Sequence, residues 1–261
     1  QQVGDEALMV KSRFPEIDVI VSENRKEGLQ FLEKSSMCRV VVMDDAFQHL
    51  RILAHHYFLL STYQKPFYKD FVFPIGTLRE PRFFANNADS VVITKTNSDL
   101  SAKAKDSINW AQKKYSGTDC EFSSIEYSSQ FISVFTNDII DLEPLTKVIV
   151  LTGIASNKVF VEKVKHSFEL YEAIEFPDHH NFTNLDVERI LNSANRLKAE
   201  TDFHDPIQKW AVVTTEKDAI RLQTLETKKP LAHLPLYYWA INLKADQGLE
   251  LEIDRIIDKI C

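Results

Sequence analysis

Short, continuous runs of β-branched residues recur along this chain, with amphipathic segments between them. Residues 39–43, 90–94 and 147–151 consist mainly of Val and Ile. A strand with one wet face alternates polar and apolar residues, whereas a continuous apolar run is typical of a parallel sheet that is covered on both faces. The sequence therefore predicts an α/β fold built around a parallel sheet.

Other segments extend the same alternation of strands and helices. Further strands are expected at residues 18–21, 57–60, 131–135, 171–176, 210–214 and 236–241. Apolar residues that fall on one face predict helices at residues 7–14, 29–32, 160–168, 187–197 and 253–260. Because four βα units follow one another in the second half, we expect a second doubly wound α/β domain there.

The length of 261 residues accommodates one large domain or two domains of ordinary size. We place the first domain at residues 1–120 and the second, smaller domain at residues 147–261. Residues 121–146 show no clear periodicity over most of their length. We interpret them as the segment that connects the two domains.

Composition argues against several classes of protein. The formal net charge is −7, whereas a protein that neutralises many nucleic-acid phosphates carries a basic excess. No apolar run approaches the roughly 20 residues that a transmembrane helix needs. The three cysteines, Cys38, Cys120 and Cys261, are far apart, which argues against a disulfide framework or a thiolate zinc site and fits a reducing cytosol.

The strongest local motif is Asp-Asp-Ala-Phe-Gln-His at residues 44–49, directly after the predicted strand at residues 39–43. Carboxylates at the carboxyl end of a parallel strand lie where open α/β sheets bind ligands, and in phosphate-loop NTPases such an aspartate helps to hold Mg²⁺. An aspartate after a strand is also a common helix cap. The strand and its two acids alone leave both interpretations open.

This motif resembles the Asp-Asp-Gly-Phe-Gln-His signature of the tetraacyldisaccharide 4′-kinases. Further segments resemble motifs of that family in the same order along the chain: Gly-Asp-Glu at residues 4–6, Pro-Ile-Gly-Thr-Leu-Arg-Glu-Pro at 74–81, Asp-His at 178–179 and Thr-Thr-Glu-Lys-Asp at 214–218. The resemblance therefore extends over most of the chain.

Membership of this family implies a phosphate-loop NTPase-like parallel sheet, followed by a second, smaller α/β domain. It implies ATP and Mg²⁺ as cofactors. The acceptor would be the 4′-hydroxyl of a tetraacylated glucosamine disaccharide 1-phosphate, a precursor in lipid A biosynthesis. The resemblance also implies a cytoplasmic protein that is peripheral to the cytoplasmic face of the inner membrane.

The resemblance assigns activation of the acceptor hydroxyl to Asp5 and His179, which match the family's catalytic acid and histidine. With the boundaries given above, these two residues come from different domains. The simpler interpretation is that Asp5 caps the helix predicted at residues 7–14 and that His179 orders a turn.

The resemblance assigns metal binding to Asp44 and Asp45. It assigns phosphate or substrate binding to Gln48, His49 and Arg79. An arginine suits anionic oxygens because its planar fork can bind two of them at once. Taken alone, Arg79 is also explained by a salt bridge within a loop.

Two other features allow more than one interpretation. The histidine pairs at residues 55–56 and 179–180 invite a metal site, but adjacent side chains diverge and no i, i+4 histidine pair accompanies them. Asp218 follows a predicted strand, where it either interacts with a helix N-terminus or contacts substrate.

The sequence also departs from the family pattern. Ala46 and Ala7 replace a usual Gly and Pro, and the family's downstream Arg-Asp pair falls on Ala54 and His55, which therefore receive no role. Nothing matches Gly-x-x-x-x-Gly-Lys-[Ser/Thr], the loop that cradles the phosphates of ATP. Since the chain begins with Gln rather than Met, we expect a fragment that is inactive alone and whose upstream coding sequence supplies this loop.

Two other functions compete with the kinase. The first is a non-catalytic α/β protein that binds lipid or nucleotide and has lost its phosphate loop. The second is a nucleotide switch that acts on a protein partner, but the motifs at residues 74–81 and 178–179 are not switch features. A Gly-Lys-Thr loop in the upstream coding sequence would decide for the kinase.

Overall fold

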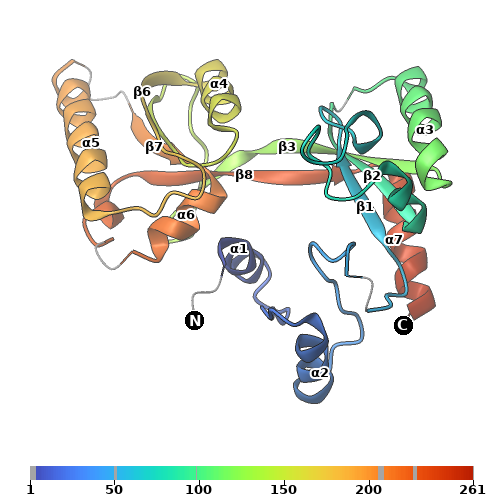
Figure 1. The fold of residues 1–261 in the computed structure, drawn as a ribbon. Coiled ribbons are helices and arrows are strands. Elements are labelled where there is room, and N and C mark those ends of the chain that lie inside the picture. Colours follow the sequence, from blue (N-terminus) through green and yellow to red (C-terminus); the bar gives the residue numbers. More distant parts are fainter. Residues whose placement is uncertain (1–3, 50–51, 98, 205–208, 226–227, 261) are drawn as a thin grey trace. The chain divides into compact units, whose positions relative to one another are not determined.

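The structure, a computed structural model, describes residues 4–49, 52–97, 99–204, 209–225 and 228–260. These residues form a mostly parallel sheet with helices packed against it (Figure 1), which confirms the predicted α/β class. The chain divides into two compact units, one of residues 1–21 and 127–241 and the other of residues 22–126 and 242–261. The chain passes between the units at three places. Two of them, after residues 126 and 241, fall within the long strands β3 (Cys120–Ser133) and β8 (Leu236–Ala245), and the third follows residue 21.

Parallel strands form the centre of the first unit, in the order β8–β7–β5–β6. Their bounds are Lys147–Thr152 for β5, Glu169–Glu175 for β6 and Trp210–Thr214 for β7. A short β4 (Ile139–Ile140) pairs with β3 in antiparallel orientation. The chain leaves β5 for β6 on one side and returns to β7 on the other, so β5 and β7 flank a topological switch point. Open α/β sheets bind ligands at the carboxyl ends of strands at such a point.

Helices cover both faces of this sheet (Figure 1). Their bounds are Asn157–Ser167 for α4, Asn184–His204 for α5 and Glu216–Gln223 for α6. Val148 and Val150 of β5 pack with α4, whereas Ile149 and Leu151 pack with α5 and α6, and all four side chains are fully buried. Burial on both faces is the reason why this strand reads as a continuous apolar run. Helix α1 (Asp5–Arg13) packs against α6, and a short 3-10 helix, η3 (Leu231–His233), precedes β8.

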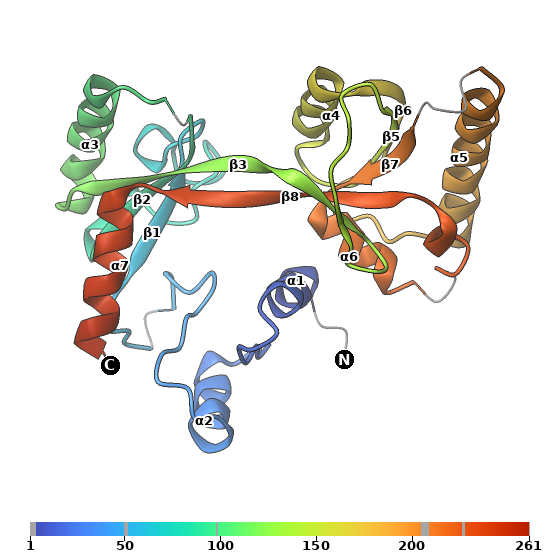
Figure 2. The same ribbon diagram turned by 180° about the vertical axis from the view of Figure 1, so that it is seen from behind.

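Parallel strands also form the centre of the second unit: β1 (Phe58–Thr62), β2 (Ser90–Thr96) and the first part of β3. Its helical segments are α2 (Arg25–Ser35), η1 (Phe67–Lys69), η2 (Arg82–Asn87), α3 (Ala102–Ser116) and α7 (Gln247–Ile260). Val91 and Ile93 of β2 pack with η1, η2 and α3. On the opposite face, Ser90 donates a hydrogen bond to Glu252 of α7 at 2.9 Å. The ribbon of α7 next to β1 and β2 is seen in Figure 2.

Most of the expected elements are present. The strands expected at residues 57–60, 90–94, 147–151, 171–176, 210–214 and 236–241 correspond to β1, β2, β5, β6, β7 and β8. The expected helices correspond to α1, α2, α4, α5 and α7. Helix α3 was not expected from the sequence, although Ser101 caps its N-terminus and Gly117 ends it with a φ of 75°.

The strands expected at residues 18–21 and 39–43 are absent from the structure. Val42 shows this plainly, since it is 90% exposed. A β-branched run becomes a strand only when a neighbouring strand takes its backbone hydrogen bonds, and no described segment of the chain pairs with residues 39–43. The prediction that Asp44 and Asp45 follow a buried strand is therefore wrong.

The two compact units combine segments that are distant in sequence. The supposed connecting segment contains most of β3, a strand of 14 residues. The first 21 residues belong to the same unit as β5–β7, and α7 belongs to the unit of β1 and β2. The domain boundaries themselves stay a prediction. Among the described helices, none is long and apolar enough to cross a lipid bilayer.

Candidate functional site

Three loops of the first unit meet at the carboxyl edge of its parallel sheet. Gly153 follows β5, residues 177–180 follow β6, and Thr215 follows β7. The backbone N–H of Gly153 donates to Oδ2 of Asp218 at 2.9 Å, which joins the first loop to the first turn of α6, directly after the third loop. The loops therefore lie at the switch point of the sheet, where α/β proteins bind ligands.

Arg221 of α6 lies at the centre of this edge, and its side chain is only 7% exposed. Its Nε donates to Oδ2 of Asp5 at 2.6 Å. Its Nη1 donates to Oδ1 of Asp218 and to the carbonyl of Gly153, both at 3.0 Å. Its Nη2 lies 3.4 Å from Nδ1 of His179. A buried guanidinium needs its N–H groups bonded and its charge paired, and these four groups supply both.

Asp218 is completely buried, and it explains why α6 begins where it does. Oγ1 of Thr215 accepts the backbone N–H of Asp218 at 3.2 Å and donates to Oδ2 of Asp218 at 2.7 Å. This arrangement resembles a capping box, in which the N-cap residue and the third helical residue bond each other. A Cβ atom on Gly153 would lie 3.3 Å from Oδ1 of Asp218, so glycine permits this close approach. Asp218 thus stabilises the helix N-terminus and anchors Arg221.

Asp5 is the first residue of α1, and Gly4 is the N-cap residue, so Asp5 does not cap this helix. Its carboxylate is instead turned to Arg221. The adjacent Glu6 lies 3.1 Å from Nζ of Lys217. A backbone hydrogen bond and then the Lys217 ammonium hold the pKa of Glu6 below its ordinary value. Two ion pairs with α6 therefore fix the first turn of α1.

His179 adopts a backbone conformation that is uncommon for a residue with a side chain. Its φ is 57°, and Oδ1 of Asp178 accepts its backbone N–H at 2.9 Å. Nζ of Lys217 lies 3.4 Å from Nε2, while Arg221 approaches Nδ1. A neutral imidazole has one acceptor nitrogen, so these two cationic donors compete for it. Asp5 and His179 both contact Arg221 and belong to one compact unit, although we expected them in different domains.

The neighbouring His180 has a separate, structural environment. Its ring stacks on Phe176 with centroids 4.5 Å apart, and its Nε2 lies 2.9 Å from Oδ2 of Asp186. The same oxygen accepts the backbone N–H and the hydroxyl of Thr183, both at 2.8 Å. His180 thus orders the turn before α5, a task that sequence analysis gave to His179 as its simpler role.

Replacement of Asp186 by Asn tests this turn. Burial alone would raise the pKa of Asp186, but hydrogen bonds from His180 and Thr183 bring it below its ordinary value of 3.8. Because the folded pKa is depressed, its contribution to stability is present above pH 3.8 and lost as the pH falls further. We expect Asp186→Asn to lower the free energy of unfolding by about 1 kcal/mol at pH 7, as for a lost helix cap. Urea unfolding at several pH values measures this, and a difference that persists at pH 2 would contradict it.

Asp44 and Asp45 lie in the second unit, on an exposed segment before β1. Asp45 has a φ of 47°, and its Oδ2 lies 3.1 Å from Nη1 of Arg79. Both side chains are largely exposed, at 67% for Asp45 and 72% for Arg79. Such an ion pair is weak and easily exchanged for other partners. Among the described residues, no three His, Cys, Asp or Glu side chains gather closely enough to hold a metal ion.

The loop that carries Arg79 is held in shape by Asp70. The carboxylate of Asp70 accepts the backbone N–H of Phe71 at 2.8 Å and both the backbone N–H and the hydroxyl of Thr77. The Thr77 hydroxyl and then the Phe71 N–H hold the pKa of Asp70 below its ordinary value. A Cβ atom on Gly76 would lie 2.1 Å from the carbonyl oxygen of Phe71, so only glycine fits there. The loop therefore presents Arg79 from a defined backbone.

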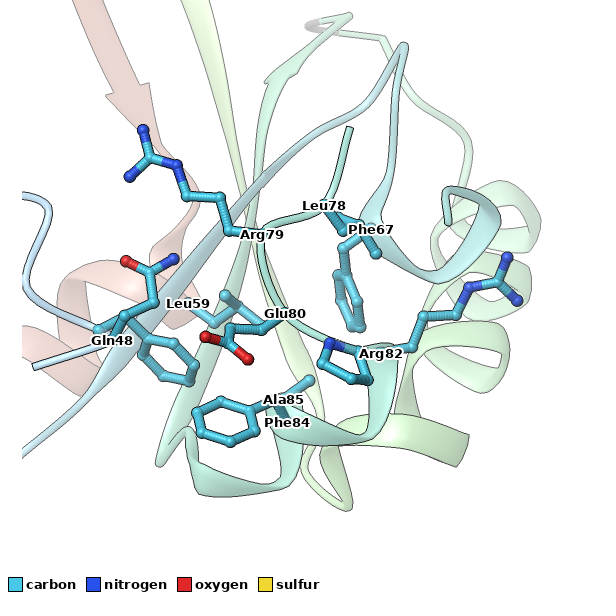
Figure 3. Close-up of a pocket in the computed structure, with 11 residues that line it drawn as sticks. Gln48, Leu59, Phe67, Leu78, Arg79, Glu80, Arg82, Phe84 and Ala85 are labelled. Atoms are coloured by element: carbon cyan, nitrogen blue, oxygen red, sulfur yellow. The ribbon is translucent and has the colours of Figure 1, made fainter. Parts of the chain in front are cut away.

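A small, mostly apolar pocket lies beside Arg79 (Figure 3). Its lining combines hydrophobic side chains with three charged residues and one amide: Phe47, Gln48, Leu59, Phe67, Leu78, Arg79, Glu80, Pro81, Arg82, Phe84 and Ala85. In Figure 3 the guanidinium groups of Arg79 and Arg82 point away from the apolar floor, to opposite sides. The structure thus brings Gln48, Asp45 and Arg79 to one region. His49 is exposed, and it does not line this pocket.

Arg221 is a site residue that was not expected from the sequence. Its signal was present, because Arg221 lies three residues after Asp218 in a helix whose neighbouring residues are apolar. An i, i+3 pair of opposite charges on a buried helix face indicates a polar cluster. The partner Asp5, 216 residues away, could not be found from spacing.

Comparisons with known proteins place this chain in a family. The sequence profile of LpxK, described as tetraacyldisaccharide-1-P 4′-kinase, matches residues 1–258. A tetraacyldisaccharide 4′-kinase of Flavobacterium johnsoniae is 33% identical over 245 residues, covering 92% of this chain and 66% of that protein. One of Bacteroides thetaiotaomicron is 32% identical over 234 residues, covering 85% of this chain and 60% of that protein. The chain thus spans less than two thirds of the length of these curated relatives.

A solved structure has the same fold. The "apo" form of LpxK from Aquifex aeolicus, crystallised in complex with ATP, superimposes with a TM-score of 0.69 at 21% sequence identity. The match covers 98% of this chain and 69% of that one. The profile match over nearly the whole length is the decisive observation, and this chain therefore belongs to the tetraacyldisaccharide-1-P 4′-kinase family.

Proposed function

We propose that this protein takes part in the transfer of the γ-phosphoryl group of ATP to the 4′-hydroxyl of tetraacyldisaccharide 1-phosphate, in lipid A biosynthesis. The family to which the chain belongs supports this reaction. The observation that carries the proposal is that one guanidinium, that of Arg221, contacts both Asp5 and His179 at the ligand-binding edge of the sheet.

A carboxylate and an imidazole at this edge suit the activation of a hydroxyl. A sugar hydroxyl is a poor nucleophile until a base accepts its proton, and a positioned base typically accelerates such a step by about 10² to 10⁴. Either Asp5 or His179 would accept the proton of the 4′-hydroxyl, and the other would stabilise the pair. Arg221 would keep both groups in place throughout.

ATP and Mg²⁺ are the cofactors of this proposal. Asp44 and Asp45 are exposed, adjacent carboxylates, and Mg²⁺ usually takes one or two carboxylates and completes its shell with water and phosphate oxygens. The residues present therefore fit Mg²⁺, with Asp45 or Asp44 as the ligand. When bound, Mg²⁺ neutralises negative charge on the phosphates. Arg79 and Gln48, which are beside these acids, would bind anionic oxygens of the substrates, and His49 is the remaining candidate for that task.

The proposed acceptor also sets where the protein works. Four acyl chains keep that lipid in a bilayer, so the protein would act as a peripheral protein at the cytoplasmic face of the inner membrane. Local cations such as Arg79 would meet the anionic surface, since the net charge of −7 is repelled by it.

A phosphoryl-transfer assay tests this function. Two samples are compared: the 261-residue chain, and the protein translated from the complete reading frame. With [γ-³²P]ATP, Mg²⁺ and tetraacyldisaccharide 1-phosphate in detergent micelles, we expect labelled lipid from the second sample and none from the first, which has no Gly-x-x-x-x-Gly-Lys-[Ser/Thr] loop. A disaccharide without the 4′-hydroxyl is the control acceptor. Labelling of the control, or none of the true acceptor, would overturn the proposal.

A further inference from the structure

The guanidinium of Arg221 joins segments that are distant in sequence. It binds Asp5 of α1, the carbonyl of Gly153 after β5 and Asp218 of its own helix, and it reaches His179 after β6. We propose that Arg221 is a positioning residue, which fixes the distance and orientation between Asp5 and His179. The expected effect of Arg221 on catalysis rests on the proposed function, whereas its effect on the arrangement of Asp5 and His179 does not.

The shape of the guanidinium explains how one side chain can do this. Nε and Nη2 point from the same edge of the planar group, so Asp5 and His179, which they contact, are held side by side. Nη1 points elsewhere, to Asp218 and Gly153. One edge therefore faces the proposed catalytic pair and the remaining donor anchors the arginine to the scaffold.

Asp218, which anchors Arg221, has hydrogen-bond partners for both of its carboxylate oxygens. Oδ2 of Asp218 accepts from Gly153 and Thr215, which leaves Oδ1 for Arg221. Because Asp218 is completely buried, its charge requires a paired cation. The buried carboxylate of Asp218 thus holds Arg221 on the side that faces the protein interior. Asp5 is 30% exposed, so the open side of the cluster is the side of the proposed pair.

Charge gives a second reason for an arginine at this position. The carboxylates of Asp5 and Asp218 both face the guanidinium of Arg221. Without this cation between them, the two negative charges would repel each other. A lysine could neutralise them, but its ammonium is a point charge without a planar fork. Arg221→Lys therefore keeps the charge and removes the geometry, which separates positioning from mere stability.

Arg13 provides a matched control. It also ties α1 to the rest of the first unit, through a hydrogen bond to the carbonyl of Ile241 at 3.0 Å and an ion pair with Glu216 at 3.4 Å. Neither of these partners is Asp5 or His179. Arg13→Lys should therefore weaken the attachment of α1 without a direct effect on the pair.

The first measurement needs no enzymatic activity. In the 261-residue chain with ¹⁵N-labelled histidine, we expect Arg221→Lys to shift the imidazole ¹⁵N resonances of His179, and Arg13→Lys to leave them unchanged. If circular dichroism shows that Arg221→Lys does not fold, Asp5→Ala replaces it, since loss of the carboxylate releases Nε and lets the guanidinium move relative to His179. Unchanged His179 resonances in the folded variant would overturn the inference.

The second measurement uses the protein from the complete reading frame under single-turnover conditions. We expect Arg221→Lys to lower the rate of transfer about 10²-fold, as a misplacement of about 1 Å can do, with little change in KM for ATP. Asp5→Asn with Arg221→Lys should be little worse than Asp5→Asn alone, because the arginine acts through the aspartate. Multiplicative losses would overturn the positioning role. If the wild-type protein transfers no phosphate, the proposed function fails, while the resonances still decide on the positioning.

Discussion

Asp5→Asn is expected to lower the single-turnover rate of phosphoryl transfer by about 10²- to 10⁴-fold, the range of a positioned general base. The variant keeps the size of the side chain but loses its negative charge, so it accepts a proton poorly and pairs only weakly with Arg221. His179→Ala is expected to have an effect of the same size. ATP affinity should hardly change, because the assigned phosphate and metal residues lie in the other compact unit.

The double variant distinguishes a catalytic pair from two structural residues. If Asp5 and His179 act as one unit, Asp5→Asn/His179→Ala should be little slower than the slower single variant. Asp186→Asn is the control, because it weakens the same loop through His180 and leaves His179 intact. Losses that multiply, or a loss of similar size in Asp186→Asn, would show that these residues support the loop rather than the chemistry.

Asp45→Asn is expected to reduce turnover about 10²- to 10³-fold. Losses of this size follow the removal of one group that stabilises charge in a transition state. Asparagine is chosen because it tolerates the left-handed backbone of this position, where φ is 47°. The free energy of unfolding should change by less than about 0.5 kcal/mol, because Asp45 is largely exposed and its ion pair with Arg79 is weak.

A second exposed aspartate of the same unit serves as the comparison. Asp119 is 64% exposed and lies 2.8 Å from Nζ of Lys113, so Asp119→Asn also removes one surface ion pair. It should leave turnover unchanged. Raising the Mg²⁺ concentration should partly restore Asp45→Asn and have no effect on Asp119→Asn. Full activity of Asp45→Asn, or its unfolding, would remove Asp45 from the proposed metal site.

The sequence by itself determined those strands and helices whose burial leaves a clear pattern of apolar residues. Strands β5 and β7 were predictable because burial on both faces demands a continuous apolar run, and α5 because one apolar stripe faces the sheet. The motifs at residues 4–6, 44–49, 74–81, 178–179 and 214–218, taken together and in order, indicated the family. Each of these signals lies within a few consecutive residues.

Residues 39–43 show where this reasoning fails. Their composition is that of a buried strand, but strand formation depends on hydrogen bonds from a neighbour that composition does not reveal. The length of β3 was underestimated for a related reason. Residues 121–130 mix polar and apolar side chains, and they form a strand because β3 pairs with β2 over Cys120–Ser124 and has β8 as its other neighbour in the sheet.

Some residues of the candidate site could be found from the sequence, and others could be found only from the tertiary structure. The sequence by itself determined that Asp5 and His179 are candidates, because both lie in recognisable motifs. Only the tertiary structure decided that they share Arg221, since its partners come from residues 5, 153, 179 and 218. A helix fixes which residues lie three or four positions apart, but a buried charge is paired by whatever the packed chain brings to it.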